Sequence, residues 1–240
     1  MKYKNIILGL IIVLFADTFA EGIFNHADFD KLLSKFVDEN GLVNYEGFKN
    51  SAQFEKYLSE IGDANLKGFT EDEKLAFYIN AYNALAIKNV LNHSPIKSPM
   101  DVERFFKDYK FKVAGEQLSL DEIEYQRIEK IELVLMHFGL VCAAVSCPKL
   151  LSEVYHADTV REMLKKNAKV FLSDTTKNQI DSENKVLHLS EIFRWFKPAF
   201  EKEYGTLNKA AAQLSNQKNK NIFNDYKIVF NKYNWKLNKQ

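Results

Sequence analysis

The residues best suited to chemistry lie together in one segment, HFGLVCAAVSCPKL, which runs from His137 to Leu150. It holds both cysteines of the chain, Cys142 and Cys147, and one of the five histidines. A cysteine thiolate is a strong nucleophile, and a nearby imidazole can accept the thiol proton. The segment therefore predicts a catalytic site with Cys147 as nucleophile and His137 as general base.

The residue after Cys147 favours a particular backbone setting. Pro148 suits the first position of a helix, so Cys147 is expected at the N-cap, where the positive end of the helix dipole favours the thiolate. Two alternatives stay open. The two cysteines could form a disulfide in an oxidising compartment, and His137 could be a hydrogen-bonded core residue. A thiol redox role ranks last, because the four-residue spacer is longer than that of the usual redox pairs.

A second polar cluster lies in the apolar stretch FYINAYNALAI, at Asn80, Tyr82 and Asn83. An unpaired buried amide costs roughly 1–3 kcal/mol, so these side chains must use their hydrogen bonds. Asn80 and Asn83 share one face of a helix. They are candidates for substrate binding, either by holding a substrate amide or by stabilising an oxyanion, and the alternative is that they cap a neighbouring loop or strand edge.

The elements that must position these residues follow from hydrophobic periodicity and capping signals. The pattern predicts a long buried helix over 72–93, a helix over 29–36 that stops at Asn40-Gly41, and a strand, turn and capped helix from Tyr109 to Glu122. The run from Ile131 to Val141 reads as a strand buried on both faces. Further expectations are helices over 156–172 and 191–204, a strand over 185–189 and one or two terminal strands. Early helices and later strands indicate an α+β domain.

Composition excludes several classes of protein. With 240 residues, 46% hydrophobic and 27% charged, the chain is expected to fold, and a formal charge of +1 gives no overall attraction to nucleic acid. Strand alternation explains the lysine-rich, aromatic tail better than nucleic-acid stacking does. No glycine-rich phosphate loop, G-x-S-x-G turn or zinc-type His/Cys spacing is present, so we expect no cofactor and no metal.

The N-terminus reads MKYKNIILGLIIVLFADTFA, with two lysines, an apolar run and small residues at Thr18 and Ala20. This pattern predicts a signal peptide over 1–20, followed by one domain over 21–240, in a periplasmic or secreted bacterial protein. The alternative is a membrane anchor, but the apolar run is about half of the roughly 20 residues that a span needs. No stable membrane span is expected after cleavage.

The motifs of the chain resemble those of the domain of unknown function 547 family. The resemblance rests on five ordered segments: VDENGLVNYEGF, FYINAYNAL, LSLDEIEY, HFGLVCAAVSCP and YNWKLN. It implies a relative of the papain- or transglutaminase-type folds, with a central, mostly antiparallel sheet. It also implies a cysteine hydrolase with Glu124, His137 and Cys147 as active residues. The chain has Tyr125 and Asn234 where the family usually has His and Asp.

Two functions are therefore carried forward. The first is an exported cysteine hydrolase or acyl transferase that acts on a peptide-like amide, with Glu124 orienting the imidazole of His137. The second is a non-catalytic envelope module with a structural cysteine pair. In that case an aromatic surface grips a peptide or protein partner; its residues are Trp195, Phe196, Tyr233 and Trp235. The oligomeric state is left open.

Overall fold

The long helix α4 (Glu71–His93) is the element against which several other helices pack. Its first turn is closed by a capping box between Thr70 and Glu73, and apolar residues cover all of its sides. A helix that is hydrophobic all round has to be covered by other elements. Helices α2, α3 and α6 and the segment after Ser119 contact it, so the helix expected over 72–93 is confirmed. The computed structural model describes residues 24–240, and the predicted signal peptide lies outside them.

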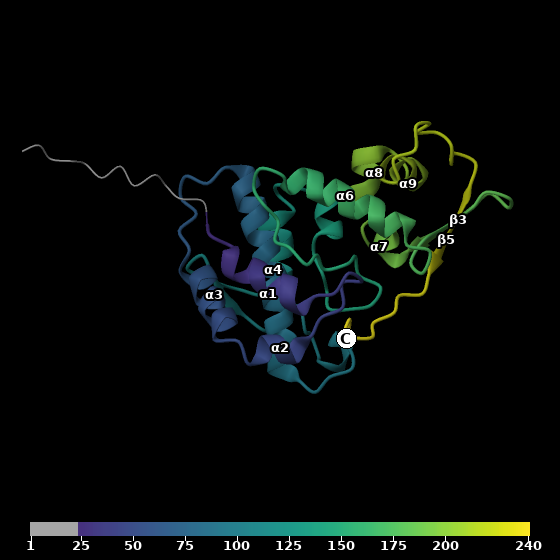
Figure 1. Ribbon diagram of the computed structural model, residues 1–240. Coiled ribbons are helices and arrows are strands. Elements are labelled where there is room, and N and C mark those ends of the chain that lie inside the picture. Colours follow the sequence, from purple (N-terminus) through teal and green to yellow (C-terminus); the bar gives the residue numbers. More distant parts are fainter. Residues whose placement is uncertain (1–23) are drawn as a thin grey trace, which may run out of the picture.

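Three helices precede α4 and cover one side of it (Figure 1). They are α1 (Ala27–Phe36), α2 (Tyr45–Lys49) and α3 (Ala52–Asp63), and the helix expected over 29–36 is α1. Ser51 caps α3 by accepting a hydrogen bond from the Phe54 amide. Between α1 and α2 the chain turns at Gly41, whose φ of 77° suits glycine better than other residues.

The segment after α4 matches the predicted strand, turn and capped helix. After the short helix η1 (Pro99–Asp101), strands β1 (Phe111–Val113) and β2 (Glu116–Leu118) form an antiparallel hairpin. Ser119 and Glu122 then close a capping box on α5 (Leu120–Ile123). This helix continues into a π-helical turn, η2 (Glu124–Ile128), so Glu124 lies where two kinds of helix meet.

The strand expected from Ile131 to Val141 is not formed, and this prediction was wrong. The segment holds only a 3-10 helix, η3 (Leu135–Phe138), which includes His137. The Glu132 carboxylate accepts hydrogen bonds from the Val134 and Leu135 amides and turns the chain. Farther on, side chains of other helices bind the backbone groups that a neighbouring strand would have paired, so the apolar run is buried without a sheet.

The second half of the chain is helical with one small sheet. Its helices are α6 (Val160–Ser173), α7 (Glu191–Trp195), α8 (Lys197–Tyr204) and α9 (Leu207–Leu214). Beside them lie the strands β3 (Gln179–Asp181), β4 (Val186–Ser190) and β5 (Lys227–Asn231). The order is β3-β4-β5, in which β3 pairs antiparallel and β5 parallel to β4. The predicted helix over 156–172 and strand over 185–189 correspond to α6 and β4. The predicted helix over 191–204 is divided at Phe196 into α7 and α8.

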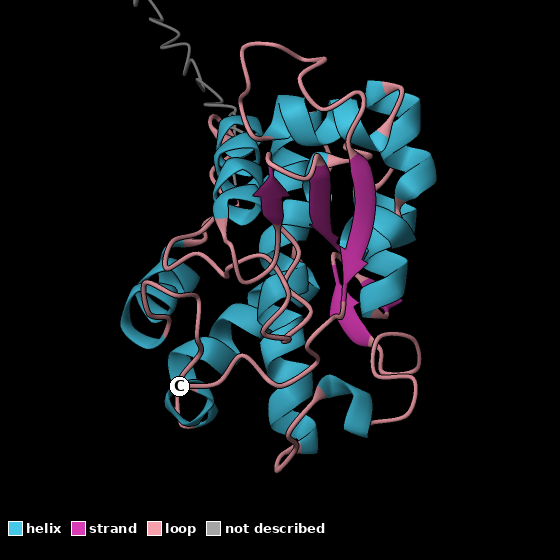
Figure 2. Cartoon of the chain, turned by 90° about the vertical axis from the view of Figure 1, so that its right-hand side faces the viewer, coloured by secondary structure: helices cyan, strands magenta, loops and turns pink. Residues whose placement is uncertain are grey.

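The α+β class is confirmed, but the expected central, mostly antiparallel sheet is not. Within residues 24–240 the strands form one two-stranded and one three-stranded sheet, and helices are the predominant regular structure (Figure 2). Strands of three to five residues cannot build a large sheet surface, so the core is buried mainly between helices. No helix in this part of the chain is long and apolar enough to cross a membrane.

After β5 the chain returns across the molecule to the N-terminal helices (Figure 1). We call residues 232–240 the C-terminal strap. The strap binds two distant segments through its backbone: the Asn238 amide donates to the Ala143 carbonyl at 3.0 Å, and the Val43 amide donates to the Asn238 carbonyl at 2.8 Å. It therefore joins the cysteine segment to the N-terminal region.

Candidate functional site

Cys142 and Cys147 form a disulfide, with sulfur atoms 2.12 Å apart. The bond closes a tight loop, residues 142–147, in which the Cys142 amide also donates to Cys147 Sγ at 2.9 Å. The expectation that Cys147 caps a helix was wrong. The chain from Pro148 to Thr159 has no helix, since α6 begins only at Val160. Cys147 therefore does not begin a helix, and its sulfur is bonded to Cys142.

The disulfide lines a cavity of about 180 Å³, which we call the disulfide cavity. Residues from six separate segments of the chain surround it: Tyr82; Phe106; Asp121, Glu124 and Tyr125; His137, Leu140, Cys142 and Cys147; Ile192, Trp195 and Phe196; Tyr233 and Trp235. All three residues of the predicted catalytic set, Glu124, His137 and Cys147, are among them. The fold thus brings them to one cavity, although 23 positions separate Cys147 from Glu124 in the sequence.

Glu124 and His137 face each other across the cavity wall. Glu124 Oε1 lies 3.9 Å from His137 Nδ1, which is within ion-pair range and beyond a normal hydrogen bond. The two side chains are only 13% and 3% exposed. The His137 ring stacks on Phe196, with ring centres 3.6 Å apart and planes inclined by 21°. The stack fixes the plane of the imidazole, so its edge with Nδ1 points at the carboxyl group.

Burial favours the neutral form of both side chains, so it shifts their pKa values in opposite directions. It raises the pKa of Glu124 to about 8, and the nearby carboxylates of Asp121 and Glu129 contribute to the increase. It lowers the pKa of His137 to about 3. At neutral pH the imidazole is therefore neutral and the carboxyl group holds a proton. A neutral imidazole can accept a proton, and a neutral carboxylic acid can donate one.

Two further acidic and phenolic groups belong to the cavity. Burial raises the pKa of Asp121, and Lys107 opposes this with its ammonium group 3.7 Å away. The Tyr233 hydroxyl lies 3.1 Å from Cys147 Sγ and 3.2 Å from Cys142 Sγ. Among residues 24–240, it is the one side-chain polar group within hydrogen-bond distance of either sulfur.

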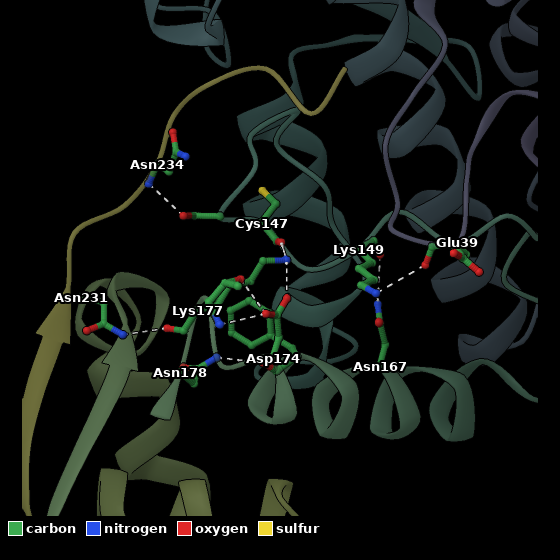
Figure 3. Close-up of polar contacts among 12 residues, drawn as sticks. Glu39, Cys147, Lys149, Asn167, Asp174, Lys177, Asn178, Asn231 and Asn234 are labelled. Carbon is green, nitrogen blue, oxygen red and sulfur yellow. Dashed lines mark hydrogen bonds and ion pairs between the residues drawn. The ribbon is translucent and has the colours of Figure 1, made fainter. Parts of the chain in front are cut away.

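The other side of the 142–147 loop is held by a buried lysine (Figure 3). Lys177 donates from Nζ to the Cys147 carbonyl at 2.8 Å and lies 3.3 Å from Asp174 Oδ2. Its side chain is 9% exposed, and burial lowers its pKa. In Figure 3 the sulfur of Cys147 points away from Lys177. Ser146, in the same loop, accepts through Oγ a hydrogen bond from the Asn234 amide of the strap.

Asn80 and Asn83 do not line the disulfide cavity. Asn80 exchanges two hydrogen bonds of 2.9 Å with the backbone of Tyr155. Asn83 donates to the Gly139 carbonyl and accepts from the Val141 amide, also at 2.9 Å. The structure thus gives both amides the loop-capping arrangement, and Asn83 holds the segment between His137 and Cys142. Tyr82, the third predicted substrate-binding residue, lines the cavity.

Sequence reasoning missed Asp121 as a residue of this site, and it treated the aromatic residues as a separate binding surface. Trp195, Phe196, Tyr233 and Trp235 instead form a wall of the same cavity. The capping box at Ser119 already placed Asp121 three positions before Glu124, on the same helical face, and this was the available signal. For the tryptophans no local signal exists, because they meet the cavity only through tertiary contacts.

The cavity has no evident provision for a metal. Within residues 24–240, no group of three or more His, Cys, Asp and Glu side chains is arranged to hold a metal ion.

Comparison with known protein families gives a match over part of the chain. Residues 66–172 match the model of a family described as "Protein of unknown function, DUF547". The matched range contains Glu124, His137 and Cys147, whereas Trp195, Tyr233 and Trp235 lie outside it. No curated protein and no solved structure matches the chain.

Proposed function

We propose that the protein is an exported cysteine hydrolase or acyl transferase that acts on a peptide-like amide. The chain is a DUF547 family protein, and the family is described as having unknown function. The proposal therefore rests on the disulfide cavity. Cys147 is the nucleophile, His137 is the general base and Glu124 positions the imidazole. The observation that carries the proposal is the convergence of these three side chains on one cavity, with Glu124 and His137 only 3.9 Å apart.

The disulfide makes reduction the first step of this mechanism. Two external thiols, from a small thiol or a protein dithiol, supply two electrons and two protons. The bond between Cys142 and Cys147 then breaks, two protein thiols form, and the external thiols become a disulfide. Only the reduced protein has a free Cys147 sulfur, so the protein with the disulfide intact represents the resting form.

The acyl-transfer steps follow from the reduced form. The Cys147 thiol gives its proton to His137, and the sulfur attacks the carbonyl carbon of the amide. The carbon–nitrogen bond then breaks, the amine leaves with the proton held by His137, and a thioester remains on Cys147. Water or a second amine then attacks the thioester carbonyl, and the carbon–sulfur bond breaks. The acid or the new amide leaves, and the proton given up by the water or amine restores the Cys147 thiol.

The electrostatics of the pair support His137 as the base. A neutral imidazole is needed for the first step, and burial keeps the pKa of His137 far below neutrality. Glu124 holds a proton at neutral pH, so it positions the ring as a neutral acid, and it can stabilise the imidazolium by releasing that proton to solvent water. We expect this to make the two groups titrate as a coupled pair.

Export is part of the proposal and has its own support. Disulfides form and persist in oxidising compartments such as the periplasm or the cell exterior. The cysteines of the chain are paired with each other, which agrees with the predicted signal peptide over 1–20. Mass analysis of the protein recovered from its native compartment tests this directly, because cleavage after Ala20 predicts a defined mass.

A matched pair of variants tests the nucleophile. Cys142→Ser leaves Cys147 as the only thiol, and Cys147→Ser leaves Cys142 as the only thiol. We expect iodoacetamide to modify Cys147 in the first variant at least about ten times faster at pH 6 than Cys142 in the second, because in the proposed mechanism the neutral His137 accepts the thiol proton as the sulfur attacks. Exposure would give the opposite order, since Cys147 is buried and Cys142 is partly exposed.

The same experiment contains its controls. Adding His137→Asn to Cys142→Ser should remove the rate advantage, while the thermal midpoint shows whether the variant is folded. Two thiols that react equally slowly, with the pH dependence of an ordinary thiol near 8.5, would remove Cys147 from the proposed mechanism.

The disulfide itself favours a second candidate, the envelope binding module. In that function the bridge is structural and the aromatic wall holds a peptide or a protein partner. The module predicts that both single cysteine variants and His137→Asn keep their ligand, whereas Trp195→Leu loses it.

A further inference from the structure

The disulfide cavity combines aromatic rings with acidic groups and contains no basic side chain other than the neutral His137. Seven of its lining residues are aromatic and two are acidic, Asp121 and Glu124, and neither lysine nor arginine lines it. A groove on the other side of the 142–147 loop has the opposite charge, because lysines line it. Lys149, Lys166 and Lys169 line that groove, together with the pair of Lys177 and Asp174.

Two aromatic side chains remain exposed at this cavity. Among residues 24–240, the large hydrophobic side chains that stay exposed include only two aromatic ones, Tyr125 at 43% and Trp195 at 41%, and both line the disulfide cavity. Exposed aromatic side chains gathered at one concave place are typical of a binding surface.

The rings form a continuous wall. The centre of the Trp195 ring lies 4.7 Å from that of Tyr233 and 5.7 Å from that of Trp235, and Tyr233 lies 4.6 Å from Trp235. Their faces carry the negative part of the ring quadrupole, which attracts a cation. Tryptophan is the strongest aromatic partner of this kind, and the chain has only these two.

The acidic groups can balance a cation in the cavity. The carboxyl group of Glu124 holds a proton while the cavity is empty, and a positive charge beside it favours its ionised form. Lys107 lies near Asp121, but within residues 24–240 no lysine or arginine has an ion pair with Glu124. At about 180 Å³ the cavity has room for one small group of a ligand. A quaternary or primary ammonium group with its short alkyl chain has that size and the matching charge.

We propose that the disulfide cavity binds a cationic alkylammonium group, which is held against Trp195 and Trp235 and balanced by Glu124 and Asp121. The inference deepens the proposed function, on which it rests for the location of the site. It assigns the amide substrate a cationic side chain or a cationic amine near the bond that is cleaved or formed. It does not require a free thiol, so the oxidised protein also binds the group.

Tetramethylammonium and neopentyl alcohol distinguish a cation site from an apolar site, because they have nearly the same shape and differ in charge. The two tryptophans of the chain both line the cavity, so tryptophan fluorescence of the oxidised protein reports on it directly. We expect a saturable fluorescence change and a raised thermal midpoint with tetramethylammonium chloride, with affinity at least about tenfold higher than for neopentyl alcohol. Sodium chloride at equal concentration is the control for ionic strength.

Variants locate the binding. Trp195→Leu and Glu124→Gln should each weaken tetramethylammonium binding by about five- to thirtyfold, as expected for loss of a desolvated cation–π contact or its balancing charge. Trp195 is 41% exposed, so its replacement should leave the fold intact, and Trp235 still reports binding. Tyr226→Leu replaces an aromatic residue outside the cavity, paired with Phe223, and should bind as the natural protein does.

Several results would overturn the inference. These are equal affinity for neopentyl alcohol, the same response to sodium chloride, unchanged binding by Trp195→Leu, or no change in both fluorescence and thermal midpoint. The result is separable from the test of Cys147. The titration uses the intact disulfide and measures no thiol reactivity, whereas the alkylation experiment uses no ammonium ligand.

Discussion

At the scale of single residues, the buried pair of Glu124 and His137 determines how the protein responds to pH. Glu124 keeps a proton in the folded state up to a pKa of about 8, against 4.5 as its ordinary value. His137 lacks a proton down to a pKa of about 3, against 6.5. The folded and unfolded states therefore bind different numbers of protons over two windows, and the windows have opposite signs.

The signs lead to a testable pH profile. Between pH 4.5 and 8 the folded Glu124 binds a proton that the unfolded chain has lost, so its contribution to stability falls as pH rises. Between pH 3 and 6.5 the unfolded His137 binds the extra proton, so its contribution falls as pH falls. The effects oppose each other between 4.5 and 6.5. Above 6.5 only the Glu124 effect remains, with a slope of up to about 1.4 kcal/mol per pH unit.

Glu124→Gln checks this profile. We expect the free energy of unfolding in urea to fall by up to about 2 kcal/mol between pH 6.5 and 8 in the natural protein, and by clearly less in the variant. Asp121→Asn should keep most of the fall, because Asp121 is a secondary cause of the raised pKa of Glu124. If Glu124→Gln retains the full fall, Glu124 is not the titrating group.

At the scale of the elements, helix α4 positions the catalytic segment through an amide side chain. Asn83 binds the Gly139 carbonyl and the Val141 amide, and it thereby supplies the pairing that a neighbouring strand would otherwise give. Gly139 also allows the segment to approach α6, since a Cβ there would lie 2.5 Å from Leu164 Cδ2. The segment between His137 and Cys142 is thus held by helices on both sides.

Asn83→Ala measures the value of this contact. The substitution leaves two buried backbone groups without their partner, which costs about 1–3 kcal/mol for each group. We expect a corresponding loss in the free energy of unfolding, measured in urea. Asn50→Ala is the matched control, because Asn50 is exposed and makes one long hydrogen bond to Glu46. Equal losses in both variants would mean that the buried pairing at Asn83 contributes nothing special.

At the scale of the whole molecule, the C-terminal strap connects the N-terminal helical region around Val43 and Tyr45 to the disulfide loop. Tyr45 donates to Asn238 Oδ1 at 2.6 Å in the interior, and Asn238 donates through its backbone to Ala143. The Val145 amide donates to the Lys236 carbonyl at 2.8 Å. Ala143 has a φ of 60°, an unfavourable conformation for alanine, and these contacts help to hold it.

Removing the Asn238 side chain should therefore affect both stability and the disulfide. We expect Asn238→Ala to lower the free energy of unfolding by about 1–3 kcal/mol, because the buried Tyr45 hydroxyl loses its acceptor. Dithiothreitol should also reduce the disulfide faster in this variant, since the strap covers the loop less firmly. Lys239→Ala, with an exposed side chain next to Asn238, should change neither quantity. An unchanged reduction rate in Asn238→Ala would separate the strap from protection of the disulfide.

The sequence by itself determined the features that depend on near neighbours. The long apolar helix around Asn83, the turn at Ala114-Gly115 and the capping box at Ser119 all follow from spacing within a few residues. The paired cysteines were one of the alternatives that the sequence allowed. The segments containing Glu124, His137 and Cys147 were also recognisable as motifs, because each motif is short and continuous.

Only the tertiary structure decided how those motifs combine. Residues 131–141 have the composition of a buried strand, yet the amide of Asn83 binds their backbone groups and the segment turns instead. The aromatic wall joins the disulfide because the strap brings Tyr233 within 3.1 Å of Cys147, across 86 positions of sequence. Local patterns cannot report such contacts. They depend on which surfaces meet when helices and strap pack together, and this is where the site acquires its charge and shape.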